Sequence, residues 1–375
     1  MESAESSGSS TGGQPAGSQV DHGAPKGGNT KKYVFMVVFP FVLVMMLVGI
    51  YAGSMHAPTP RDLPVAVAGS AAQAQPLADS LNATGGSPVE VRVVATADEA
   101  RQLVHDREIA GALALPAAGP GDDAVLYTAQ AAGAAQVQMV QSVFQPVADA
   151  QQLTLDQQDI APLPASDGMG VTTLFTAIGW MLAGYMLVTV LTSGAPELLP
   201  LRRLAPLLAG WSALVSALVW VIVGPLTGAI EGHTLPVLGL GWLSVFAVGL
   251  GQALFARLLG PLAVIPGIAL FMFLGVPASN IMMSIHSVPG FFGFLHHVLP
   301  LPAAGETLRS VLYFGGDGVG PHLLVLAVWA VAGLALTAGV DLLRRRKSRG
   351  QDEAADTPSS SSAGSPGAQG ALTSA

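Results

Sequence analysis

Six apolar runs, each about as long as a membrane-crossing helix, set the strongest limit on how this chain can fold. A helix rising 1.5 Å per residue needs about 20 apolar residues to cross the hydrocarbon core of a bilayer. Residues 33–52 meet this requirement without a charge and directly follow Lys31 and Lys32. The sequence therefore predicts a polytopic α-helical membrane protein with six spans. The other five runs lie at about residues 170–192, 205–228, 236–256, 258–277 and 322–343.

The composition agrees with this prediction and excludes several classes of site. Charged residues make up 11% of the 375 residues, against about 25% in soluble domains. The chain has no cysteine, which excludes disulfides, thiolate metal sites and cysteine nucleophiles. Its 16 basic residues are too dispersed for a nucleic-acid surface, so we expect no nucleic-acid partner.

The first run has a second reading, as the core of a cleaved signal peptide. Small residues at 52–54 would suit a cleavage site. However, the 30-residue polar lead and the apolar core are both long for a signal peptide. We therefore expect residues 33–52 to form a transmembrane helix.

The basic residues predict the orientation, because Lys and Arg near span ends favour the cytoplasmic side. With the amino terminus inside, 11 of the 16 basic residues fall on the inner side. We expect a multi-pass protein of the plasma membrane, in contact with its lipid, with both termini cytoplasmic and residues 53–169 outside. The inner residues are Lys26, Lys31, Lys32, Arg202, Arg203, Arg257, Arg344, Arg345, Arg346, Lys347 and Arg349.

Residues 53–169 have the character of a folded domain between the first two spans. They carry thirteen acidic and four basic side chains, a net charge of −9. Short β-type runs alternate with helical patterns, which predicts an inserted small α/β extracytoplasmic domain. The β-type runs are 63–68, 89–95, 109–115 and 124–128, and the helical patterns are about 72–83, 97–107 and 130–153.

The remaining segments complete the predicted domain organisation. Residues 1–30 and the end of 344–375 are rich in Gly and Ser, so we expect disordered cytoplasmic tails, the second after a basic start. Residues 170–343 form a five-helix transmembrane domain. Within it, residues 278–320 are apolar but broken by prolines and glycines, which predicts an external hairpin of short half-inserted or interfacial helices that neighbouring spans shield.

The chain lacks the motifs that would let it power transport or catalyse a reaction. A phosphate-binding loop ends in Gly-Lys-Ser/Thr, but Lys347, the lysine that precedes a serine, follows Arg346. The spans contain no Asp, Glu, Lys, Arg or His away from their ends, with Asp341 about one turn from the inner boundary, which disfavours proton or sodium coupling. Metalloprotease and serine-hydrolase motifs are absent too, so we expect no enzyme, no catalytic residue and no cofactor.

Three histidines in the broken hairpin raise the alternative of a metal site. His286, His296 and His297 could act together with Glu306. However, adjacent residues on a helix point about 100° apart, whereas helical zinc ligands share a face. Interfacial histidines are the preferred interpretation, and no metal ligand is predicted.

The loop at residues 192–203 also has two interpretations. A short amphipathic element containing Glu197, Leu198 and Leu199 could dock a cytosolic partner. Alternatively, the loop is a plain turn whose Arg202 and Arg203 fix the topology.

The whole layout resembles the membrane subunit of the type-2 ABC permease superfamily, including its phage-infection-protein (Pip) group. Three stretches carry the resemblance: residues 99–104 with 109–116, residues 299–302 with 306–313, and the loop after the second span. In that family this loop holds the coupling helix that touches the ATPase. The resemblance thus implies coupling residues Glu197, Leu198, Leu199, Arg202 and Arg203, and external gate residues Pro300, Pro302, Glu306 and Arg309.

We expect a permease subunit of an ABC-type exporter for an amphipathic or hydrophobic substrate. The resemblance implies a homodimer or heterodimer of permeases with a separate ATP-binding subunit. The alternative is a stand-alone, Pip-like envelope protein whose external domain binds a partner, a phage or a cell-wall component.

Overall fold

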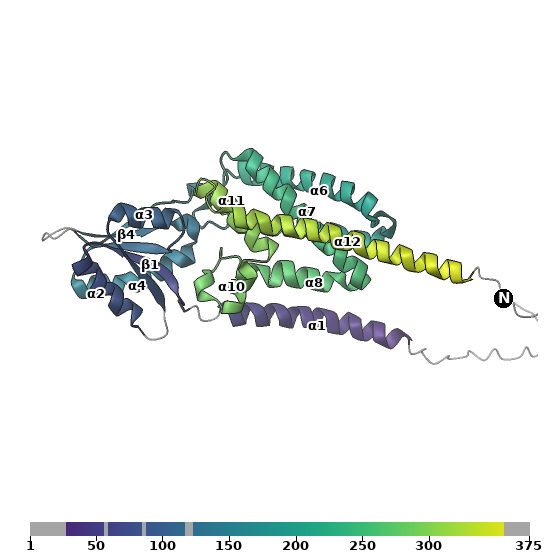
Figure 1. Cartoon of the computed structure of the whole chain (residues 1–375), viewed down its shortest axis with the longest axis horizontal. Helices are drawn as coiled ribbons and strands as arrows, with labels where there is room; N and C mark the ends of the chain where they lie inside the picture. Colours follow the sequence, from purple (N-terminus) through teal and green to yellow (C-terminus); the bar gives the residue numbers. More distant parts are fainter. Residues whose placement is uncertain (1–27, 56–58, 85–87, 117–122, 356–375) are drawn as a thin grey trace, which may run out of the picture. The chain divides into compact units, whose positions relative to one another are not determined.

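The computed structural model describes residues 28–55, 59–84, 88–116 and 123–355 (Figure 1). Most of the two tails predicted to be disordered, residues 1–27 and 356–375, lies outside these ranges. Helix α12 (Val319–Ala355) extends well past Arg344, where the cytoplasmic tail was expected to begin. Residues 344–355 are rich in Arg, Lys, Gln, Glu and Ala, which favour helix, so the last span continues into them.

The chain divides into two compact units within its first helix, at residues 1–46 and 47–375. The first unit contains most of α1 (Gly28–Met55), an apolar helix with Pro40 inside it. The second unit contains a sheet layer and a set of long apolar helices.

The sheet layer is a mixed five-stranded sheet at residues 63–159. Its strand order is β2-β1-β3-β4-β5, and every neighbouring pair is parallel except β3 and β4. The strands are β1 (Leu63–Ala68), β2 (Val89–Val94), β3 (Gly111–Ala114), β4 (Ala124–Thr128) and β5 (Leu155–Asp159), and the helices are α2 (Ala71–Asn82), α3 (Ala97–His105) and α4 (Ala134–Gln151).

Both faces of this sheet are covered by helices. Leu63, Val65 and Val67 pack in a cluster with α2 and α4, whereas Ala66 and Ala68 pack with α3. Successive side chains of a strand point to opposite faces, so β1 is apolar at every position because both of its faces are buried.

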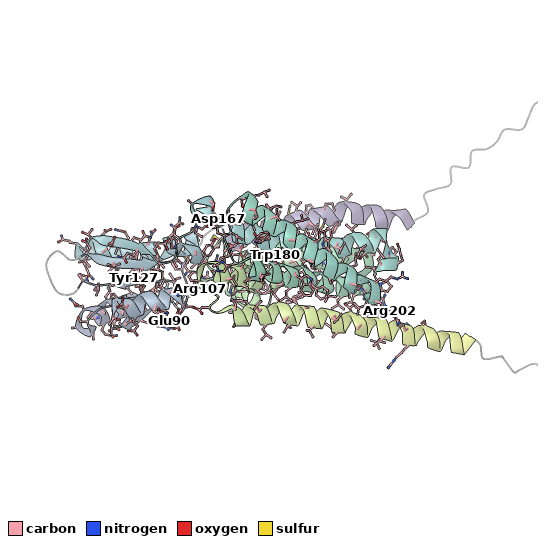
Figure 2. All side chains as sticks on the ribbon, turned by 90° about the horizontal axis from the view of Figure 1, so that it is seen from above. Glu90, Arg107, Tyr127, Asp167, Trp180 and Arg202 are labelled. Carbon is pink, nitrogen blue, oxygen red and sulfur yellow. The ribbon has the colours of Figure 1, made fainter. Side chains whose placement is uncertain are left out.

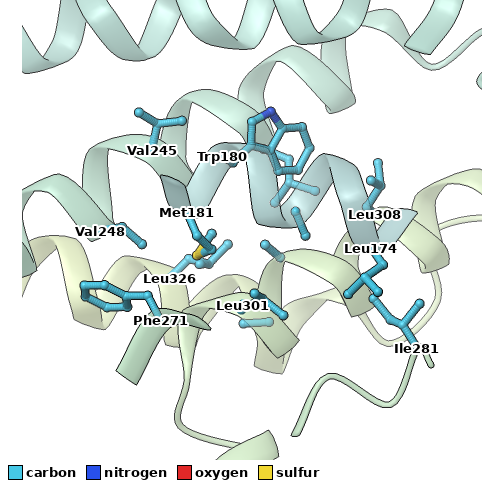
Figure 3. Close-up of a cluster of buried hydrophobic side chains, with 14 of the residues drawn as sticks. Leu174, Trp180, Met181, Val245, Val248, Phe271, Ile281, Leu301, Leu308 and Leu326 are labelled. Carbon is cyan, nitrogen blue, oxygen red and sulfur yellow. The ribbon is translucent and has the colours of Figure 1, made fainter. Parts of the chain in front are cut away.

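Five helical segments are long and apolar enough to cross a membrane. Their shared core gathers around Trp180 and Met181 of α5, with Phe271 and Leu308 from later segments (Figure 3). The candidate spans are Val37–Ser54, Thr172–Gly194, Leu201–Leu226, Thr234–Ala278 and Val319–Ser348. They contain the helices α5 (Thr172–Gly194), α6 (Leu201–Val221), α7 (Thr234–Leu259), α8 (Val264–Ile268) and α9 (Gly275–Ala278), while α10 (Gly290–His296) and α11 (Pro300–Tyr313) precede α12.

The fourth candidate span folds back on itself. Its 45 residues would measure about 68 Å as one straight helix, roughly twice the thickness of the hydrocarbon core. Gly260 has a φ of +59°, in the left-handed region that favours glycine. After this break the chain packs back against α7. The Gln252 side chain of α7 donates to the Ala263 carbonyl oxygen (3.0 Å), and Phe271 packs beside Gly251 of α7. The segment therefore forms two antiparallel neighbours, at the place where the sequence predicted spans 236–256 and 258–277.

Candidate functional site

The four predicted gate residues lie on α11, which is a buried helix. Pro300 and Pro302 occupy its first turn, where a missing backbone N–H costs little. Every residue from Pro300 to Ser310 is buried, and α11 packs against α5, α7 and α12. Close packing depends on small residues: a Cβ on Gly305 would lie 2.5 Å from Ile281 Cδ1.

The broken hairpin holds two short helices with different surroundings. Phe291 and Phe294 of α10 are 59% and 65% exposed. Helix α11 is instead buried among α5, α7 and α12. The expectation of half-inserted or interfacial helices, shielded by neighbouring spans, stays a prediction.

Glu306 is the centre of a buried ionic cluster. Its side chain is fully buried and accepts hydrogen bonds from three side chains. Arg309 Nη1 and Asn280 Nδ2 each lie 3.1 Å from Oε1, and Arg107 pairs with Oε2. Arg107 Nη1 also donates to Ser310 Oγ at 2.8 Å. These five residues are called the Glu306 cluster below.

The charges of the cluster favour an ionised Glu306. Burial raises the pKa of the Glu306 carboxyl. The positive charges of Arg309 and Arg107 together outweigh this effect and lower the pKa from 4.5 to about 2. Burial lowers the pKa of Arg309, and the nearby Glu306 opposes that effect. Two guanidinium groups thus share one carboxylate, and that carboxylate is their counter-charge.

Arg107 links the sheet layer to α11. It follows α3 in the sequence, 199 residues before Glu306, and is labelled in Figure 2. Its φ of +62° is unusual for a residue other than glycine. The cluster and the ring of Phe314, 5.2 Å from the guanidinium carbon, hold the side chain in place. The sequence does not single out Arg107, because nothing in the local pattern around it indicates a partner so distant.

The histidines considered as metal ligands are not arranged as a metal site with Glu306. His296 Nδ1 lies 2.8 Å from the Ala278 carbonyl oxygen, and both carboxylate oxygens of Glu306 are engaged by Arg107, Arg309 and Asn280. The His296 ring packs edge-on against His297, with centroids 5.2 Å apart. His296 is thus a hydrogen-bonded, buried histidine.

The predicted coupling residues surround a short turn between α5 and α6. Residues Pro196–Leu198 form a 3-10 helix, and Arg203 Nη1 donates to the Glu197 carbonyl oxygen at 2.9 Å. Leu198 and Leu199 pack against the ends of α5, α6 and α7. The side chains of Glu197, Arg202 (Figure 2) and Arg203 are exposed. The loop thus has an apolar side that faces the bundle and an exposed side that carries its charges.

An ion pair fastens this loop to two long helices. Arg257, at the end of α7, is 7% exposed and donates through Nε to Asp341 Oδ1 of α12 at 2.8 Å. Its Nη2 donates to the Leu199 carbonyl oxygen at 2.5 Å, and Arg344 donates to the Arg257 carbonyl oxygen. We call Leu199, Arg257, Asp341 and Arg344 the Arg257 junction. The sequence showed that Arg257 and Asp341 both lie near inner span ends, but not that they pair.

One comparison with known proteins gives a match. Residues 31–195 match the family model described as "ABC-2 family transporter protein". The matched range runs from α1 through the sheet layer and α5 to the start of the predicted coupling loop. Neither the curated proteins nor the solved structures contain a significant match to the chain.

Proposed function

We propose that the chain is the membrane subunit of an exporter of the type-2 ABC permease superfamily, a proposal supported by the family match over residues 31–195. Members of this family generally work in a lipid membrane with a separate ATP-binding subunit. The proposed substrate is amphipathic or hydrophobic, since the bundle core around Trp180 and Phe271 is apolar. The proposed assembly is a homodimer or heterodimer of permeases with ATPase subunits.

The proposed topology has six crossings, with both termini inside. The fold-back at Gly260 supports two crossings within residues 234–278, because α7 and the segment after it lie antiparallel. Eleven of the sixteen basic residues then lie on the inner side, and the acidic residues 53–169 lie outside. A reporter inserted after residue 120 should report an external location, and a cytoplasmic signal would overturn this orientation.

The observation that carries the proposal is the Arg257 junction. A coupling loop must pass its displacement to the helices that line a transport path. Here the Leu199 carbonyl is bonded to Arg257 of α7, which is paired with Asp341 of α12. Because the pair is mostly buried, it is screened less than a surface pair and resists separation. A partner that moves residues 196–203 would therefore move α7 and α12 as well.

The Glu306 cluster supports the other half of the proposal, an external gate. It is built on α11, which packs against the same two helices, α7 and α12. Through Arg107 it also binds the sheet layer. We propose that α11 and the rest of residues 278–320 close the external end of the path.

Co-purification tests the coupling proposal. The full chain is purified from its native cells in detergent, and captured ATPases are identified by mass spectrometry. Glu197→Ala and Arg203→Ala should reduce the captured ATPase, because they remove the exposed charges of the loop. Arg92→Ala, an exposed arginine of β2, is the matched control and should leave capture unchanged. Failure of the wild-type chain to capture any ATPase, with Glu197 and Arg203 freely replaceable, would sink the coupled-exporter proposal.

The stand-alone envelope protein remains the second candidate. The net charge of −9 on residues 53–169 favours it, because such a surface would suit a cationic partner. The same experiment distinguishes the two functions: capture of an envelope component in place of an ATPase would support the second.

A further inference from the structure

A cluster of metal-binding side chains lies at the contact between the sheet layer and the α11–α12 loop. His105 is the last residue of α3, Asp106 follows it, and Asp317 belongs to the loop before α12. One possible ligand atom from each residue lies within 4.8 Å of the other two. Among the described residues, this is the group of His, Asp or Glu side chains that could hold a metal ion together. It is separate from the Glu306 cluster and contains none of His286, His296 and His297.

The fold holds the two halves of this cluster together. Arg107, next to Asp106 in the sequence, is bonded to Ser310 and Glu306 of α11, so the end of α3 is fixed against that helix. The His105 ring packs edge-on against Phe314, with ring centroids 6.0 Å apart. Asp317, which follows Asp106 by 211 residues and His105 by 212, therefore lies beside them without a metal ion to draw them together.

The loop that carries Asp317 has a backbone suited to a ligand turn. Gly315, Gly316 and Gly318 have φ values of +62°, +87° and +72°, which residues with a Cβ rarely adopt. The Asp317 N–H donates to the Phe314 carbonyl oxygen at 3.0 Å, so the turn begins at the residue that contacts His105. Three flanking glycines also let the Asp317 carboxylate shift by the small distance that coordination would need.

The donor set points to zinc. Zinc accepts both imidazole nitrogen and carboxylate oxygen as ligands, whereas calcium and magnesium prefer oxygen alone. Tetrahedral ligands about 2.0–2.1 Å from zinc lie about 3.3 Å from one another. His105 Nδ1 and Asp106 Oδ1, which are in hydrogen-bond contact, are 3.4 Å apart, close to this spacing, and the Asp317 carboxylate oxygen lies within 4.8 Å of both.

We propose that His105, Asp106 and Asp317 bind one Zn²⁺ ion that fastens the end of α3 to the α11–α12 loop. Without a cation, Asp106 is satisfied by Gln102 Nε2, at 2.9 Å from Oδ1 and 3.1 Å from Oδ2. Asp317 is exposed, and the carboxylates of Asp106 and Asp317 lie near each other with only the His105 imidazole beside them in this group. Zinc supplies the positive charge that these carboxylates face, and water takes the fourth position.

Zinc titration of the purified full chain in detergent, after removal of metal by EDTA, tests the site. The wild-type chain should bind one zinc per chain. Asp317→Asn should weaken the affinity by about 100-fold or more, since it replaces a charged ligand and even outer-shell partners contribute about 10–100-fold. Asp156→Asn, an exposed acid on β5, is the matched control and should bind as the wild type does. Since Asp317 lies exposed on a loop, its substitution leaves the fold intact even if His105→Ala does not.

Hydrogen exchange supplies a second readout. Zinc should slow amide exchange across residues 314–318 in the wild type and in Asp156→Asn, but not in Asp317→Asn. Equal zinc affinity in Asp317→Asn and wild type would overturn the proposal, as would absence of binding at micromolar zinc. Loss of binding in His297→Ala alone would also overturn it, by placing the zinc elsewhere. None of these readouts depends on transport or on an ATPase.

Discussion

Replacement of Glu306 by Gln tests whether the buried ionic cluster stabilises the fold. The substitution keeps the size of the side chain and one carbonyl oxygen but removes the negative charge. Arg107 and Arg309 would then be left beside a neutral amide, and the Arg309 side chain is only 3% exposed, so water cannot replace the lost partner. A buried charge without a counter-charge is strongly destabilising.

The size of the effect follows from the pKa of Glu306. A fall from 4.5 to about 2 corresponds to about 3 kcal/mol of stabilisation of the folded chain by the ionised carboxylate. Removal of one partner from a buried ion pair costs about 3–5 kcal/mol in other proteins, which agrees. We therefore expect Glu306→Gln to lower the free energy of unfolding by about 3 kcal/mol at pH 7.

The same pKa fixes the pH dependence. Because the folded-state pKa of Glu306 lies below its unfolded value of 4.5, the stabilisation is complete above that value. It is lost as the pH falls from about 4.5 towards 2, because the unfolded chain then binds the proton more tightly. The difference between wild type and Glu306→Gln should shrink over this range.

The assay is unfolding by SDS in mixed micelles, followed by tryptophan fluorescence. Glu108→Gln is the control: Glu108 is 57% exposed and 3.8 Å from Arg92, so its loss should change the free energy of unfolding by less than about 1 kcal/mol. A Glu306→Gln chain within about 1 kcal/mol of wild type at pH 7 would refute the argument.

Two further substitutions test the packing of the bundle and the Arg257 junction. Gly184→Ala should cost about 1–3 kcal/mol, because its Cβ would lie 2.6 Å from the Val245 carbonyl oxygen. Gly179→Ala on the same helix has open space and should be nearly neutral in the same SDS titration, so equal effects would contradict this packing. Asp341→Asn should cost about 1–3 kcal/mol, because it removes the counter-charge of Arg257. It should also speed amide exchange in residues 196–203, and unchanged exchange there would show that the junction does not hold the loop.

The sequence predicted the positions of four strands and missed the fifth for a physical reason. Strands β1 to β4 lie within the four β-type runs because burial demands apolar side chains there. Strand β5 reads Leu-Asp-Gln-Gln-Asp and is mostly exposed, so it lacks this signal. Its conformation comes from backbone pairing with β4, and such pairing leaves little trace in a single sequence.

The site residues divide in the same way. Glu306 and Arg309 lie one helical turn apart, and the proline-led helix around them was visible in the sequence. Their partner Arg107 lies about 200 residues earlier, and Arg257 lies 84 residues before Asp341. Periodicity describes a residue's own element and cannot say which distant element packs against it. The charges could be found from sequence, but their pairing needed the fold.

The two ionic groups are connected through one pair of helices, α7 and α12. Along this pair, glycine brings the backbones together: a Cβ on Gly333 of α12 would lie 2.9 Å from Leu250 Cβ of α7. Trp329 of α12 packs beside Gly251 and donates to the Val298 carbonyl oxygen of the segment before α11. The predicted spans carry no Asp, Glu, Lys, Arg or His away from their ends, which disfavours a shift of the pair driven by proton or sodium binding there. Under the proposed function, a force applied to residues 196–203 enters at Arg257 and Asp341 and reaches α11 through close-packed backbones.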